Sequence, residues 1–383
     1  MASSAKSSAS SDNIALLLFF VFWYIGNAKY NEYNTGALES VGGKNSGMTM
    51  SISTLQLGVC ALYSIILWIV SINPVKLCGL QMPSRQLIPA ITFNDFLMTI
   101  PVGVFLSAAH SSSVFAFSGD PIFGQIVKSG EPVLSALVGF LFYKKAPTFT
   151  KLLCLPVIVG GVAFASLKKD DTGMYQLKFD QTALIFGMLA NIFAAFKGNE
   201  NSKLMKGPGG GPTDTYKRYG GVGNQFAVTT IIAFIVSVPL MFYTEGDKWP
   251  TLKQHLVSNK ELQFNLVASG LGFYIYNEVT TRFVYVCISP SVRRLLMLRV
   301  SLMVLPQLAT MTISKTSAVT SSVANTAKRV IVMIYMAAVT GKVLTEEQKI
   351  GAGVAIFGVF GYSVIDEVFK SPPSIKQKDL KRE

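Results

Sequence analysis

Residues 121–142 have the sequence PIFGQIVKSGEPVLSALVGFLF, in which Lys128 stands between two apolar runs. Residues 328–339 have the sequence KRVIVMIYMAAV, so Lys328 and Arg329 lead directly into a third apolar run. A cation at the centre of a membrane helix costs about 2.5 to 3.5 kcal/mol even on insertion scales, and it normally faces a wet cavity or a partner. The nearest acid, Glu131, balances only one of the three charges. The two stretches therefore predict membrane helices that share an anion-binding cavity.

The composition of the whole chain is that of a membrane protein. The mean hydropathy is +0.43, half of the 383 residues are apolar, and 14% are charged, whereas soluble domains carry about 25% charged residues. A spanning helix needs about 20 apolar residues. On that basis the hydropathy predicts spans at 14–39, 48–72, 86–111, 119–143, 147–167, 180–205, 222–243, 262–281, 317–340 and 346–366.

The charged residues indicate an orientation and exclude several classes of protein. An even number of spans leaves both termini on one side, and the larger number of Lys and Arg in the loops of that side predicts that it is cytoplasm-like. No basic run is interleaved with exposed aromatic residues, so no nucleic-acid partner is expected. The chain has four cysteines without a C-x-x-C pair and two histidines. This pattern indicates no metal, no cofactor and no enzyme.

One order of features occurs twice along the chain. A cation, an apolar helix, a short charged loop and a Gly-rich helix follow one another from Lys128 to Ala165 and again from Lys328 to Tyr362. Because five helices per half is an odd number, the second half would enter the membrane in the opposite orientation. We therefore expect an all-α membrane protein with about ten transmembrane helices as two inverted five-helix repeats. The expected parts are a polar tail at 1–13, a first repeat at 14–167, a connecting loop at 168–179, a second repeat at 180–366 and a basic tail at 367–383.

Several motifs also carry a family resemblance. The specific ones are Lys128-Ser129-Gly130-Glu131-Pro132 and Asn325-Thr326-Ala327-Lys328-Arg329-Val330, and they are accompanied by Phe22-Trp23-Tyr24, Ser53–Leu57, Pro156–Ala165, Tyr276–Val279 and Gly351–Tyr362. With these the chain resembles the plastid phosphate translocators of the drug/metabolite transporter superfamily, which exchange phosphate for triose phosphates and related compounds. The resemblance implies that the phosphate-binding cations are Lys128, Lys328 and Arg329.

The same resemblance implies further site residues that match less closely. The substrate-binding tyrosine of the family falls by context on Tyr276, although the family's spacing of 23 residues before the Lys-Arg pair lands on Leu305. Ser112 stands 16 positions before Lys128, where the family has a threonine, and His110 lies one position from a family histidine. Lys197 replaces an arginine and lacks the fork that suits a carboxylate. This change predicts weaker recognition of three-carbon acids than of triose phosphates.

The displaced spacing at Tyr276 indicates an insertion at 280–308. Removing Thr280–Leu308 would join Val279 to Ala309 and restore the eighth helix of the family. The insertion contains Arg282, Arg293, Arg294 and Arg299, which make another membrane crossing costly. We expect an interfacial or poorly packed excursion there. If the insertion breaks the eighth helix, a variant without transport activity is favoured.

The expected function is antiport of inorganic phosphate for a triose phosphate or a related phosphorylated C3 to C6 metabolite. In the empty carrier, the crowded cations would slow passage through the occluded state. A bound dianion would neutralise them, and this difference favours strict exchange by alternating access. A monomer in the lipid bilayer of a chloroplast envelope, or of another plastid-bounding membrane, is expected. A nucleotide-sugar or other organic-anion transporter of the same superfamily, and a cation-lined anion channel, remain alternatives.

Each site residue also has a purely structural interpretation. Lys328 and Arg329 could extend to a membrane interface if their helix began later. Lys128 could form a bridge with Glu131, Tyr276 could belong to an aromatic belt, and Ser112 could be a hydroxyl in ordinary helix packing.

Overall fold

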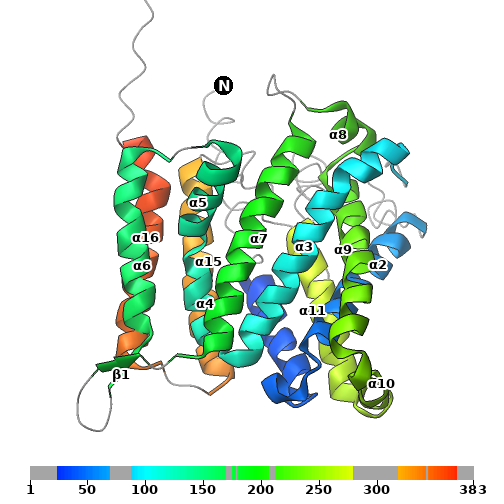
Figure 1. Cartoon of the computed structure of the whole chain (residues 1–383), viewed down its shortest axis with the longest axis horizontal. Coiled ribbons are helices and arrows are strands. Elements are labelled where there is room, and N and C mark those ends of the chain that lie inside the picture. The colour runs from blue at the N-terminus through cyan, green and yellow to red at the C-terminus, as the bar shows by residue number, and fades with distance from the viewer. Residues whose placement is uncertain are drawn as a thin grey trace, which may run out of the picture.

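The computed structural model describes residues 24–69, 88–145, 147–169, 175–177, 179–206, 212–278, 318–341 and 344–368. Within these ranges, long helices stand side by side in one bundle, and a short two-stranded ribbon lies at one end (Figure 1). The helices are residues 24–39, α2 (Thr49–Ile69), α3 (Phe93–Gly119), α4 (Pro121–Ser129), α5 (Glu131–Tyr143), α6 (Phe149–Ala165), α7 (Gln181–Met205), α8 (Asp214–Tyr219), α9 (Val222–Glu245), α10 (Trp249–Ser258), α11 (Lys260–Glu278), α15 (Ala318–Val339) and α16 (Glu346–Val368). Short 3-10 turns lie at Gly43–Ser46 and Gly246–Lys248, and the strands β1 (Leu167–Lys169) and β2 (Tyr175–Leu177) pair antiparallel.

The helices have the lengths and surfaces of membrane spans. In the described part of the chain, Thr49–Ile69, Phe93–Gly119, Gln181–Met205 and Gly223–Ser258 are long and apolar enough to cross a membrane, and the bent pair α4 and α5 would make a fifth span. Phe149 and Phe357, on α6 and α16, expose 74% and 72% of their surfaces. Polar Gln56, in contrast, is fully buried. Apolar side chains outside and polar ones inside fit a helical membrane protein.

Two predicted spans have different boundaries in the structure. The third was expected to end near residue 111, but α3 continues to Gly119. Its serines do not stop it, because the Ser113 hydroxyl donates to the Ala109 carbonyl and the Ser118 hydroxyl to the Phe115 carbonyl. The fourth, expected as one helix, is two: α4 and α5 meet at Gly130 with a bend of 46°. The proposed connecting loop contains the β1–β2 ribbon. The predicted insertion at 280–308 lies outside the described residues.

Asp120 and Pro121 explain the sharp turn between α3 and α4. The Asp120 carboxylate accepts hydrogen bonds from the amides of Ile122 (3.0 Å) and Phe123 (3.2 Å), so it caps the new helix. Pro121 occupies the first turn, where its missing N–H group costs nothing. This turn sends α4 back into the bundle, toward the level at which the predicted cations lie.

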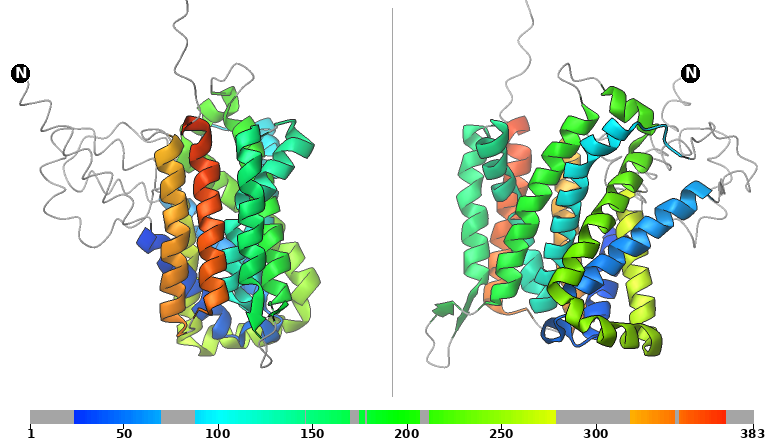
Figure 2. Two further views of the ribbon diagram at one scale, coloured as in Figure 1. Left: turned by 90° about the vertical axis from the view of Figure 1, so that its left-hand side faces the viewer. Right: turned by 45° about the vertical axis from the view of Figure 1, so that its right-hand side comes forward.

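Helices α6 and α16 pack through glycines. A methyl group added at Gly161 would lie 2.3 Å from the Ala355 amide nitrogen, and one added at Gly351 would lie 2.4 Å from the Ala165 amide nitrogen. The two helices therefore meet backbone to backbone, as small residues allow in membrane helices. Figure 2 shows α15 beside α16, so these three helices form one end of the bundle.

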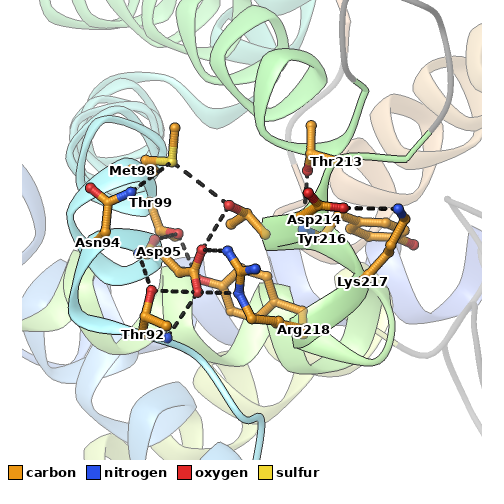
Figure 3. A network of polar contacts seen from close by, with 12 residues as sticks. Thr92, Asn94, Asp95, Met98, Thr99, Thr213, Asp214, Tyr216, Lys217 and Arg218 are labelled. Carbon is orange, nitrogen blue, oxygen red and sulfur yellow. Dashed lines mark hydrogen bonds and ion pairs between the residues drawn. The ribbon is translucent and has the colours of Figure 1, made fainter.

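The short helix α8 is tied to the start of α3 by a polar network (Figure 3). The Arg218 guanidinium donates two hydrogen bonds to the Asp95 carboxylate, from Nε (2.7 Å) and from Nη2 (2.5 Å). The same carboxylate accepts from the Thr92 amide and hydroxyl, both at 2.8 Å, and from the Thr215 hydroxyl at 2.7 Å. Asp95 thus caps its own helix and anchors the connection between α7 and α9. This bond to Asp95 is also the main reason that the pKa of Arg218 is raised.

Candidate functional site

The break between α4 and α5 follows from the sequence Lys128-Ser-Gly-Glu-Pro132. Proline has no N–H group, so no amide hydrogen at position 132 can bond the Lys128 carbonyl four residues earlier. Gly130 takes the turn, and its amide bonds the Val127 carbonyl at 3.0 Å. At a rise of about 1.5 Å per residue, α4 and α5 measure roughly 14 and 20 Å. The break therefore lies near the middle of the bundle, as the α4–α5 pair in Figure 1 indicates.

Lys128 lies at the end of α4 and points toward α3. Its Nζ donates to the Ser113 hydroxyl at 3.0 Å and lies 4.9 Å from the centre of the Phe117 ring. The backbone beside it is fixed from α7, because the buried Asn191 amide donates to the Val127 carbonyl at 3.1 Å. Lys128 is thus held by a hydroxyl and an aromatic face and has no ion pair with Glu131 among the described salt bridges. The simple Lys128–Glu131 bridge considered from the sequence is wrong.

Lys328 and Arg329 lie in the middle of α15, which runs without interruption from Ala318 to Val339. Ten residues precede Lys328 in this helix and ten follow Arg329, so neither side chain is near a helix end. Arg329 Nη1 donates to the Lys128 carbonyl at 2.6 Å, and Arg329 Nη2 forms an ion pair with Glu131. The side chain of Arg329 is only 11% exposed. The interpretation in which these residues extend to a membrane interface is wrong.

The charged groups form one cluster drawn from both halves of the chain. Lys328 interacts electrostatically with Arg329, Glu131, Lys128 and Lys197. Lys128 likewise interacts with Arg329, Glu131 and Lys197. Among the described residues, the cluster therefore contains four basic side chains and one carboxylate. Such an arrangement attracts anions, and an oxyanion with several acceptor atoms matches both the fork of arginine and the point charge of lysine.

His110 borders this cluster and is held by a buried chain of amides. The His110 Nε2 atom lies 3.0 Å from Gln56 Oε1, while Gln56 Nε2 donates to Asn34 Oδ1 (2.8 Å) and to the Ser269 hydroxyl (2.9 Å). His110 Nδ1 is buried and has no hydrogen-bond partner among the described residues. His110 interacts electrostatically with Lys128 and Lys197. A buried polar atom of this kind, beside the cations, could form a hydrogen bond with a bound ligand.

The structure brings most of the predicted residues together. Lys128, Lys328, Arg329, Lys197 and His110 belong to one electrostatically connected group. Ser112 is buried on α3, but the hydroxyl that bonds Lys128 belongs to the neighbouring Ser113. Ser113 was not predicted, because the hydroxyl was assigned only from its spacing to Lys128 in the sequence. Tyr276 lies on α11, and its side chain is outside the described ones. Gln56 was not predicted as a site residue, although it stands in the Ser53–Leu57 motif; its place among several hydroxyl residues of a predicted membrane helix was the available signal.

The described part of the chain contains no group of three or more His, Cys, Asp or Glu side chains that could hold a metal ion.

The sequence matches the Triose-phosphate Transporter family over residues 14–305 and 289–363. It is similar to phosphoenolpyruvate/phosphate translocator 3, chloroplastic, of Oryza sativa subsp. japonica, with 24% identity over 93% of this chain and 75% of that protein. It is similar to glucose-6-phosphate/phosphate translocator 2, chloroplastic, of Arabidopsis thaliana, with 25% identity over 92% of this chain and 76% of the relative. It is also similar to the triose phosphate/phosphate translocator, chloroplastic, of Pisum sativum, with 25% identity over 91% and 71%.

Proposed function

This chain belongs to the Triose-phosphate Transporter family, and from that premise we propose that it is an antiporter of inorganic phosphate and a triose phosphate or related phosphorylated C3 to C6 metabolite. The relatives named above are phosphate translocators that differ in the organic substrate in their names. The observation that carries the proposal is the meeting of Lys128 with Lys328 and Arg329 in mid-helix, with one carboxylate among four cations. This excess of basic side chains over carboxylates favours the binding of an anion.

We further propose ten membrane spans arranged as two inverted five-helix repeats. The spans would be the helix at 24–39, α2, α3, the pair α4 and α5, α6, α7, α9, α11, α15 and α16. The contact of α6 with α16 supports the repeat, because it is reciprocal: Gly161 lies against Ala355, and Gly351 lies against Ala165. In both helices the alanine follows the glycine by four residues. A two-fold axis between equivalent helices gives this kind of self-complementary contact.

In the proposed site, Arg329, Lys328 and Lys128 hold the phosphoryl group. Lys197 and His110 interact electrostatically with Lys128. They would contact the remainder of the substrate, together with Ser112 or Ser113 and Tyr276. The four cations have to lose water if the empty site closes, whereas a phosphate dianion replaces that water with charged acceptors. The loaded carrier would therefore switch between its outward-open and inward-open states far more often than the empty carrier. Export of one substrate would then be coupled to import of the other.

Reconstitution into liposomes tests this function. Labelled phosphate should enter vesicles that contain unlabelled phosphate or triose phosphate and should enter empty vesicles slowly. Arg329→Ala and Lys328→Ala should lose exchange, while the matched controls Arg218→Ala, which affects the Asp95 pair, and Lys349→Ala, which affects an exposed pair with Glu346, should keep it. Rapid uptake into empty vesicles would indicate an anion channel. Exchange that requires an internal nucleotide sugar would indicate the other transporter class.

We also propose that the protein acts as a monomer in a plastid-bounding membrane. The chloroplastic relatives support the location, and a fluorescent fusion viewed beside chlorophyll tests it. The two segments matched to the family overlap at residues 289–305, which lie within the predicted insertion at 280–308. Deleting Thr280–Leu308 and measuring exchange tests whether this segment is needed; loss of the wild-type exchange rate on deletion would show that it is a working part of the carrier.

A further inference from the structure

Both terminal nitrogens of Arg329 are bound by acceptors of the protein itself. Arg329 Nη1 donates to the Lys128 carbonyl at 2.6 Å, and Arg329 Nη2 pairs with Glu131 Oε2. The third nitrogen, Nε, is buried and has no hydrogen-bond partner among the described residues. An oxyanion that binds an arginine with two parallel hydrogen bonds can use the edge formed by Nε and Nη2. On Arg329, one half of that edge is available and Glu131 occupies the other half.

The sequence around the break explains why the two acceptors of Arg329, the Lys128 carbonyl and the Glu131 carboxylate, differ in mobility. The Lys128 carbonyl belongs to the backbone, and Pro132 offers it no amide hydrogen, so it holds Nη1 in a fixed place. Glu131 is the first residue of α5, where the helix dipole favours a negative side chain. Its side chain is 40% exposed, whereas that of Arg329 is 11% exposed. Of the two partners, Glu131 is therefore the one with room to move.

We propose that Glu131 is a built-in counter-ion of Arg329, and that the phosphoryl group of the substrate displaces it from Nη2. The inference rests on the proposed phosphate exchange and adds a residue to it. The incoming group would take Nε and Nη2 together, while the Lys128 carbonyl keeps Nη1 in place. A dianion outcompetes a single carboxylate there because Lys128 and Lys328 add their charges to its binding. Glu131 thus sets how tightly phosphate binds.

If the Glu131–Arg329 pair were only a static bridge between α5 and α15, the loss of Glu131 would change phosphate binding in the opposite direction. If Glu131 only orients Arg329, its loss should loosen the arginine and weaken phosphate binding. If Glu131 competes with phosphate, its loss should remove a rival anion and a repulsive charge, and binding should become tighter. The direction of the change in KM for phosphate separates the two roles without knowledge of its size.

The test is homologous phosphate exchange by wild type, Glu131→Gln and Glu131→Asp in liposomes. The Gln variant should lower the KM for phosphate at least about fivefold, because a like charge is removed from beside the ligand. The Asp variant keeps the charge with a shorter reach and should lie between wild type and Gln. Glu200→Gln is the matched control, since Glu200 pairs with Tyr143 and Lys203 instead, and its KM should equal that of wild type. A KM that stays the same or rises in the Gln variant overturns the proposal, and the Asp variant decides by the same criterion if the Gln variant cannot be purified.

A second measurement keeps this idea separate from the transport function. Phosphate should raise the unfolding temperature of the detergent-solubilised Glu131→Gln protein at lower concentrations than it does for wild type. An equal or weaker response, or no response in either protein, overturns the counter-ion role. If wild type fails to exchange phosphate but this difference in binding is present, the proposed function fails and the role of Glu131 in anion binding stands.

Discussion

Replacing Gly161 with alanine should force α6 away from α16 and destabilise the bundle. The added methyl group would lie 2.3 Å from the Ala355 amide nitrogen, 2.7 Å from the Gly351 carbonyl oxygen and 2.8 Å from the Ala355 Cα. All three neighbours are backbone atoms, so no side chain can rotate to relieve the contact. The helices have to separate or shift over part of their length.

The size of the effect follows from two opposing terms. Overpacking a close contact costs about 1 to 3 kcal/mol, and alanine in a helix regains about 0.5 to 1 kcal/mol relative to glycine. The net loss for Gly161→Ala should therefore be about 1 to 2 kcal/mol. Gly160 is the matched control, because a methyl group there meets nothing within 4 Å. Gly160→Ala should be neutral or slightly stabilising.

Unfolding of the purified protein by a denaturing detergent, followed by tryptophan fluorescence, measures both changes. Gly351→Ala and Gly353→Ala repeat the comparison on α16, since a methyl group at Gly351 lies 2.4 Å from the Ala165 amide nitrogen and one at Gly353 meets nothing within 4 Å. The reasoning is refuted if the members of each pair behave alike, because then the distance to the facing backbone has no influence on stability.

Further substitutions test three other parts of the structure. Ser113→Ala should raise the KM for phosphate more than Ser112→Ala does, because the Ser113 hydroxyl holds Lys128 Nζ at 3.0 Å; equal effects in liposome exchange would show that this bond has no role. Asp95→Ala should cost about 3 kcal/mol in the same unfolding assay, because it strands a buried set of donors and removes a helix cap. Arg218→Ala should destabilise the protein less than half as much, since the Arg218 side chain is 40% exposed and water can reach the site. A larger loss of stability for Arg218→Ala than for Asp95→Ala would contradict the role of Asp95 as the centre of this network. Asp120→Ala should cost about 1 kcal/mol through loss of the α4 cap, and no change in the unfolding midpoint would mean that Pro121 alone sets the turn.

The sequence predicted the positions of the helices and the cation cluster for physical reasons that are local. Apolar length determines where a span lies, so α7, α15 and α16 lie within about two residues of their predicted positions, as element boundaries usually do at best. Charges inside such spans are expected to share a wet cavity, and in the structure Lys128, Lys328 and Arg329 interact electrostatically with one another. These features depend on hydropathy and on charge, which can be seen in the sequence.

The partners of these charges could not be predicted in the same way. Ser112 and Ser113 are adjacent in a helix, and only the rotation of α3 about its axis decides which hydroxyl meets Lys128. Sequence spacing placed Glu131 beside Lys128, on the assumption of a continuous helix. The bend at Gly130 turns α5 away from α4, and Glu131 then meets Arg329 from the other half of the chain. Contacts that depend on the rotation of a helix about its axis, or on a break within a helix, can be identified only once the three-dimensional fold is known.

The break also makes the site asymmetric in spite of the proposed two-fold relation between the halves. Residues 128–132 are Lys-Ser-Gly-Glu-Pro, whereas residues 328–332 are Lys-Arg-Val-Ile-Val, without an acid or a proline. The second half therefore builds the continuous helix α15, in which backbone carbonyls have partners within the helix. Among the described residues, the backbone carbonyl and the carboxylate that Arg329 contacts both belong to the first half. The repeat relation thus accounts for where the cations meet, and Pro132 accounts for how one of them is held.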